Sequence, residues 1–191
     1  MGSRCAWLWE VEAAYQHGNV GAAAQSAWMY TLGLGRKFED VTWSPTFWAY
    51  FDFATGDNRG NGFHHLFPLG HKYLGFMDLF GRRNIEDLNF QFSVKPMPKL
   101  KVLLWWHIFH LQNTADVPYN VNMTPFVATA GGSADLGQEL DLIAKYSITP
   151  RSNLLLGYSH FFAGDFYATN PIPPPFAGDA DFYYAQFTQN F

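Results

Sequence analysis

Paired carboxylates are the residues of this 191-residue chain best suited to acid–base chemistry. Glu10 and Glu12 form one pair, and Glu139 and Asp141 form another. Residues two apart in an extended strand share a face, so each pair would present both carboxyl groups to one side, as glycoside hydrolysis requires. Lys145 shares the face of the second pair, which favours a solvated wall of mixed charge over a catalytic dyad. No enzyme activity and no catalytic residue are predicted.

Histidines are the second group of residues that could do chemistry. His64, His65 and His71 fall within eight residues of one long link, and three imidazoles could ligate zinc. No fourth ligand stands at a reliable spacing, and the single cysteine excludes the multi-cysteine zinc patterns. We therefore predict no metal site and no cofactor, and we interpret these side chains as hydrogen-bonding partners of other loops.

Strands must position these groups, because apolar and polar residues alternate with a period of two through most of the chain. In one typical segment, Leu88 and Phe90 alternate with Asn89. Segments of about ten residues with one apolar face suit strands that cross a bilayer. Similar runs predict eight strands, at residues 6–16, 23–36, 45–55, 86–95, 100–110, 138–149, 153–163 and 180–191.

The links between these strands alternate between long and short, as they do in outer-membrane barrels with short periplasmic turns and longer outer loops. The long links are 56–85, 111–137 and 164–179, the last of which is rich in proline. The shorter links are 18–21, 37–44, 96–99 and 149–152. Only the first of these departs from the rule, because it is short but belongs to the long-loop side.

Composition indicates the same class of protein. Aromatic residues make up 19% of the chain, and membrane barrels carry such residues as girdles at both interfaces. A net charge of −4 argues against nucleic acid as a partner. The chain has no run of about 18 apolar residues, so no transmembrane helix is predicted. Because residues 1–6 lack the features of a secretion signal, we expect the chain to be mature-numbered or, preferably, a fragment of a longer protein.

Three ordered motifs and the last strand carry a resemblance to a known family. The motifs are 66–75 (followed by Asp78-Leu79 and Asn84-Ile85), 137–141 and 157–165, and the last strand contributes 179–186. From about Phe53 to Phe191 the chain resembles the alginate export family of outer-membrane β-barrels. The resemblance implies a monomeric barrel of about eighteen strands in a Gram-negative outer membrane, with a water-filled lumen that passes an anionic polysaccharide. The eight strands here would be its C-terminal part.

The predicted fold is all-β, with residues 1–191 forming one part of an antiparallel transmembrane β-barrel. The predicted function is passage of a hydrophilic solute, and the resemblance implies a polysaccharide such as alginate. Two alternatives stay open: a complete eight-stranded barrel with a structural or adhesion role, and a soluble β domain that binds carbohydrate through its tryptophans. The expected partners are outer-membrane lipid, the solute, and the barrel-assembly machinery that would read a last strand ending in Phe191; nucleic acid and a second copy are not expected.

Alternation separates the two faces of the strands, and the resemblance together with the aromatic excess assigns the more polar face to the lumen. The candidate lumen-lining residues are Glu10, Glu12, Gln91, Lys95, Lys101, Trp105, His107, Glu139, Asp141, Lys145 and Gln186. Since carboxylates and lysines share this face, the predicted wall has mixed charge and is not the basic wall that a polyanion needs. We expect the links 56–85 and 111–137 to narrow the mouth. The candidate gating residues in the first of them are His71, Lys72, Asp78, Arg82 and Arg83.

Tryptophans could stack on sugar rings or belong to the interface belt. They include Trp7, Trp9, Trp43, Trp48 and the adjacent pair Trp105 and Trp106. Alternation turns one ring of the adjacent pair inward and the other outward. Trp106 shares a face with Leu104 and Ile108 and is assigned to lipid, so Trp105 is the predicted solute contact.

Overall fold

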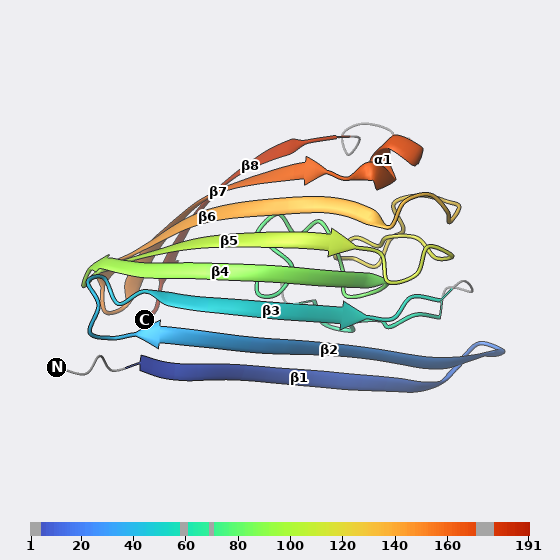
Figure 1. Ribbon diagram of the computed structural model, residues 1–191, viewed down its shortest axis with the longest axis horizontal. Helices are drawn as coiled ribbons and strands as arrows, with labels where there is room; N and C mark the ends of the chain where they lie inside the picture. Colours follow the sequence, from blue (N-terminus) through green and yellow to red (C-terminus); the bar gives the residue numbers. More distant parts are fainter. Residues whose placement is uncertain (1–4, 58–60, 69–70, 171–177) are drawn as a thin grey trace.

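The computed structural model describes residues 5–57, 61–68, 71–170 and 178–191, and consists of one antiparallel sheet (Figure 1). Eight strands follow one another in chain order across this sheet, which confirms the predicted all-β antiparallel architecture. The strands are β1 (Cys5–Val20), β2 (Ala23–Phe38), β3 (Thr46–Ala54), β4 (Ile85–Met97), β5 (Leu100–His110), β6 (Asp135–Thr149), β7 (Ser152–Ala163) and β8 (Ala180–Gln189).

The observed strands differ from the predicted ones mainly at the first hairpin. β1 and β2 continue to Val20 and Ala23, so the turn contains only two residues, and Gly21 adopts the φ of +63° that such tight turns favour. A short helix, α1 (Asp165–Thr169), occupies part of the link that was predicted to be a loop throughout. The proline-rich residues 171–175 of that link lie outside the described residues.

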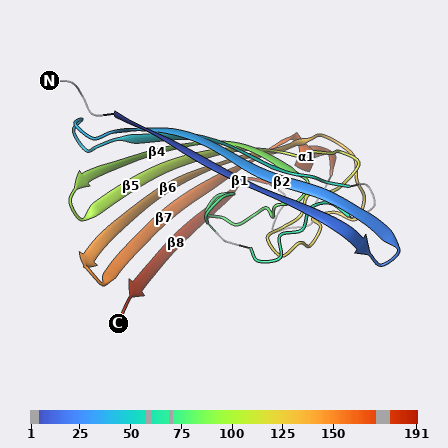
Figure 2. The ribbon, with the colours of Figure 1, turned by 90° about the horizontal axis from the view of Figure 1, so that it is seen from below.

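The sheet is strongly curved and open, with a concave and a convex face (Figure 2). β1 and β8 form its two edges and are not paired with each other in the described structure, whereas a complete eight-stranded barrel would pair them. The long links and the short β1–β2 turn lie at one end of the sheet, the loop end, and the other short connections lie at the opposite end, the turn end (Figure 1). Among the described residues, no helix is long and apolar enough to cross a membrane.

Polarity is reversed relative to a soluble β domain. The convex face exposes large apolar side chains, among them Trp9 at 77% and Leu34 at 58%, whereas Asp52 and Glu139 on the concave face are at most 2% exposed. A soluble sandwich or lipocalin would bury the first group and expose the second. This distribution suits a sheet whose convex face meets lipid.

Aromatic pairs lie near both ends of the convex face. At the loop end, the rings of Tyr15 and Trp28 are 4.1 Å apart. At the turn end, the rings of Phe47 and Phe92 are 4.6 Å apart. Aromatic side chains at both ends of the lipid-facing surface are typical of membrane-spanning strands.

Residues 55–84, here called the infolded loop, leave the end of β3 and turn back onto the concave face (Figure 2). Phe63, Leu74 and Phe80 of this loop are buried against concave-face residues such as Met29 and Phe109. The apolar core of the molecule therefore lies between the loop and the sheet. Burial of these side chains anchors the loop to the strands.

Candidate functional site: a polar wall beneath the infolded loop

The strand register places the predicted lumen-lining residues on the concave face, where the infolded loop divides them into two groups. Trp105, His107, Glu139 and Asp141 lie beneath the loop and are at most 3% exposed. The others are partly or fully exposed: Glu10, Glu12, Gln91, Lys95, Lys101, Lys145 and Gln186. Trp105 therefore faces inward, as predicted, but is not accessible to a solute in this conformation.

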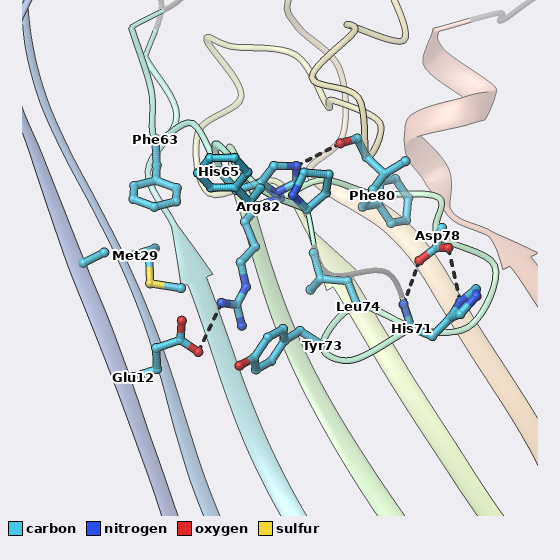
Figure 3. A pocket seen from close by; sticks show the side chains of 14 residues that line it. Glu12, Met29, Phe63, His65, His71, Tyr73, Leu74, Asp78, Phe80 and Arg82 are labelled. Atoms are coloured by element: carbon cyan, nitrogen blue, oxygen red, sulfur yellow. Dashed lines mark hydrogen bonds and ion pairs between the residues drawn. The ribbon is translucent and has the colours of Figure 1, made fainter. Parts of the chain in front are cut away.

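Arg82 of the infolded loop binds the concave face through an almost completely buried guanidinium (Figure 3). Its Nη2 lies 2.6 Å from Oδ1 of Asp52 on β3 and donates to Oγ1 of Thr31 on β2 at 2.7 Å. Its Nη1 lies 3.6 Å from the carboxylate of Glu12 on β1. The ring of Tyr73 stacks on the guanidinium at 3.7 Å. One side chain thus joins the loop to three strands.

A second attachment uses the backbone of the loop. The N–H of Met77 donates to Oε1 of Glu139 at 2.9 Å, and the N–H of Phe76 donates to Oδ2 of Asp141 at 3.3 Å. Both carboxylates belong to β6 and are 0% exposed. Gly75 approaches so closely that a Cβ on it would lie 2.3 Å from Oε1 of Glu139. Peptide dipoles of the loop therefore solvate carboxylates that the strands alone would leave bare.

His107 and Trp105 continue this network along β5. Nδ1 of His107 lies 2.8 Å from Oδ2 of Asp87, and its Nε2 lies 3.9 Å from Asp141. Nε1 of Trp105 donates to Oδ1 of Asn89 at 2.8 Å. A buried imidazole between two buried carboxylates holds adjacent strands together and makes His107 a structural residue of the wall.

Two cavities lie between the infolded loop and the concave face. The larger, about 250 Å³, is lined by side chains such as Glu12, His71 and Arg82 (Figure 3). The smaller, about 140 Å³, is lined by residues that include Glu10, Tyr50 and Lys72. In this conformation the loop and the sheet enclose small cavities lined by both apolar and polar side chains.

The other predicted gating residues hold the loop in shape. Nδ1 of His71 lies 3.1 Å from Oδ2 of Asp78, which also accepts the His71 N–H at its other oxygen. Nζ of Lys72 is exposed and lies 3.9 Å from the carboxylate of Glu10. The guanidinium of Arg83 stacks on Tyr119, in the outer loop (residues 111–134), at 4.1 Å. The two long loops are thus in direct contact.

Sequence reasoning missed the partners that complete this site. Asp52, Asp87, Asn89 and Ser159 are polar, at most 2% exposed, and bonded into the network. Each stands at an inward position of a predicted strand, so the alternation could have identified them as lumen residues. Within the described residues, no group of three or more His, Cys, Asp or Glu side chains is placed to hold a metal ion.

His65 joins the infolded loop to the outer loop. Its Nδ1 accepts the N–H of Arg82 at 3.1 Å, and its Nε2 lies 2.8 Å from the carbonyl oxygen of Val121. Only a neutral ring with its proton on Nε2 satisfies both contacts. Burial lowers the pKa of His65, and the nearby positive charge of Arg82 acts in the same direction.

Acidification is expected to loosen this junction. The folded protein binds the proton less readily than the unfolded chain, so the junction becomes less stable as the pH drops below about 6.5. For one proton, the equilibrium constant for opening rises at most about tenfold per pH unit. His65→Gln should lose this response, since an amide can accept from Arg82 and donate to Val121 at either pH. Hydrogen exchange of the loop amides, corrected for intrinsic rates, tests this between about pH 7.5 and about pH 5. Equal pH responses in the two proteins would contradict the role of His65.

Comparison with known proteins adds one finding. The family model described as Alginate export matches residues 1–173, which contain β1 to β7, the infolded loop and the outer loop. No curated protein matches the chain.

Proposed function

The chain belongs to the alginate export family, and on that premise we propose that it forms part of the wall of an outer-membrane channel for an anionic polysaccharide. Membership implies an outer-membrane location and a role in transport, not in catalysis. The reversed polarity of the sheet supports the first inference, and the charge distribution on the concave face supports an anionic solute.

The lysine triad, Lys95, Lys101 and Lys145, is the observation that carries this proposal. Lys101 and Lys145 are direct cross-strand partners on β5 and β6, and Lys95 lies beside them on β4. All three are exposed on the concave face near the turn end. Like charges placed opposite each other destabilise a sheet, and a bound anion would offset their repulsion.

The carboxylates of the same face do not neutralise the triad. Glu139 and Asp141 are fully buried and bound by backbone N–H groups of the infolded loop. Asp141 and Lys145 are four residues apart on one strand, which corresponds to about 13 Å. The two carboxylates of β6 are therefore covered and separated along the strands from the lysine triad, which lies open near the turn end. Clustered lysines on a pore wall select for anions.

The double variant Lys101→Gln/Lys145→Gln is expected to weaken binding of an oligouronate roughly four- to tenfold at low salt, and less at high salt. Lys99→Gln is the matched control, because Lys99 lies in the adjacent turn, where its Nζ donates to the carbonyl oxygen of Ile148. Fluorescence anisotropy of a labelled oligouronate with the purified protein in detergent micelles measures the effect. Equal losses in the double variant and the control would overturn the assignment of the triad.

Gating by the infolded loop belongs to the same proposal. The loop covers the loop-end half of the concave face and carries the predicted gating residues, so its release would widen the passage. Outer-membrane lipid against the convex face, the assembly machinery at the strand preceding Phe191, and a monomeric state are the remaining elements of the proposal.

A further inference from the structure

Trp48 and Tyr50 form an aromatic floor on the concave face of β3. Their rings are stacked, with centroids 5.1 Å apart and planes inclined by 19°. Their direct cross-strand partners on β2 are Gly35 and Gly33. A Cβ on Gly35 would lie 2.5 Å from the indole, and one on Gly33 would lie 2.3 Å from the phenol ring. Each ring therefore occupies the space over a β2 residue that has no side chain, and both rings stay partly exposed on the concave face.

The aromatic floor differs from the buried ring that sequence analysis favoured. Trp105 is 3% exposed and packs under Phe76 of the infolded loop, with the ring centroids 6.3 Å apart. Trp48 and Tyr50 are only partly buried. They therefore present accessible aromatic surface on the concave wall.

Polar groups border the aromatic floor. Gln91 on β4 is the direct partner of Trp48, and the hydroxyl of Tyr50 donates to Oε2 of Glu10 at 3.1 Å. Tyr50, Glu10 and Gln91 line the 140 Å³ cavity together with Lys72. A flat apolar surface with hydrogen-bonding groups at its rim matches a pyranose ring, which has an apolar C–H face and polar hydroxyls at its edge.

We propose that Trp48 and Tyr50 are a stacking site for a pyranose ring of the transported polysaccharide, an inference that rests on the proposed function. Gln91 and Glu10 are placed to bond hydroxyls of the stacked sugar. Lys95 follows Gln91 by four residues on β4, about 13 Å along the strand. A linear uronate stacked on the aromatic floor would thus extend to the lysine triad, where a carboxylate of a later unit meets positive charge.

Two polyanions distinguish stacking from charge attraction. The probes are a linear oligouronate and a polyglutamate of similar charge, each titrated into the purified protein in detergent micelles. Trp48→Ala should weaken oligouronate binding roughly three- to tenfold and leave polyglutamate binding unchanged. Trp48→Phe should retain most of the oligouronate affinity, and Trp9→Ala, on the convex face, should change neither probe. Far-UV circular dichroism establishes that each variant is folded.

Gly35→Val gives an independent test that keeps the indole. The new side chain would enter the space of the ring and displace it, so oligouronate affinity should again fall while polyglutamate affinity does not. Unchanged oligouronate binding in both Trp48→Ala and Gly35→Val overturns the stacking site and leaves the proposed channel intact. A wild-type protein that binds neither polyanion overturns the proposed function, and the stacking site with it.

Discussion

Arg82→Ala is expected to release the infolded loop from the concave face. The change removes the cation that lies 2.6 Å from Asp52 and leaves that carboxylate buried, with a side chain only 3% exposed. Removing one partner of a buried ion pair typically costs about 3–5 kcal/mol, which is large compared with the free energy of local opening of a loop. Limited proteolysis in detergent should therefore cleave within residues 55–84 much faster than in the wild type, and hydrogen exchange there should rise by at least a hundredfold.

Removing both partners gives the control for this result. Arg82→Met combined with Asp52→Leu eliminates the charges together, and replacing a whole buried pair by apolar groups is often nearly neutral. The double variant should thus be less labile than Arg82→Ala. Arg151→Ala, in an exposed turn, should leave the loop protected. If Arg82→Ala protects the loop as well as the wild type does, the ion pair is not what holds it.

Gly75→Val is the second change with a large expected effect. Gly75 has a φ of +86°, which a β-branched residue rarely adopts, and its Cβ would overlap the carboxylate of Glu139. Displacing the loop at this point separates the N–H groups of Phe76 and Met77 from two fully buried carboxylates. Backbone strain of about 1–3 kcal/mol and one or two uncompensated buried charges together predict complete loss of the seated loop.

A second glycine separates the strain of this change from the steric clash. Gly131 also has a positive φ, +125°, but a Cβ there would meet nothing within 4 Å. Gly131→Val should therefore show the cost of backbone strain alone, confined to the outer loop. Proteolysis of residues 55–84 in the two variants makes the comparison. Equal lability would mean that contact with Glu139 is not the reason for glycine at position 75.

The strands could be predicted from the sequence because alternation is a local signal. The pattern in 100–110 gave β5 its observed bounds, since each residue reports its own face. α1 was missed because five residues carry too little periodicity to stand out among prolines and glycines. The first hairpin was placed early because Gly18 resembles a turn residue, although it pairs within the ladder with Gln25.

The sequence could predict which residues belong to the site, but not how they are arranged. Arg82, Glu139 and Asp141 were each identified as lumen or loop residues, but their shared role depends on the return of the infolded loop to the sheet. That return is set by contacts between residues far apart in the chain, such as Phe80 with Phe109, which no local pattern encodes. The sequence likewise could not show that Trp105 is covered, because Phe76, which covers it, belongs to a distant segment of the chain.

The attachment of Phe76 and Met77 to β6 has a consequence for how this protein can change through mutation. Both bonds come from main-chain N–H groups, which every residue except proline supplies. The two anchoring bonds themselves thus do not depend on which side chains stand at positions 76 and 77. Exposed side chains elsewhere in the loop, such as that of Lys72, can change while these bonds persist. Main-chain anchoring of this kind lets the side chains of a loop diverge while its attachment to the sheet is kept.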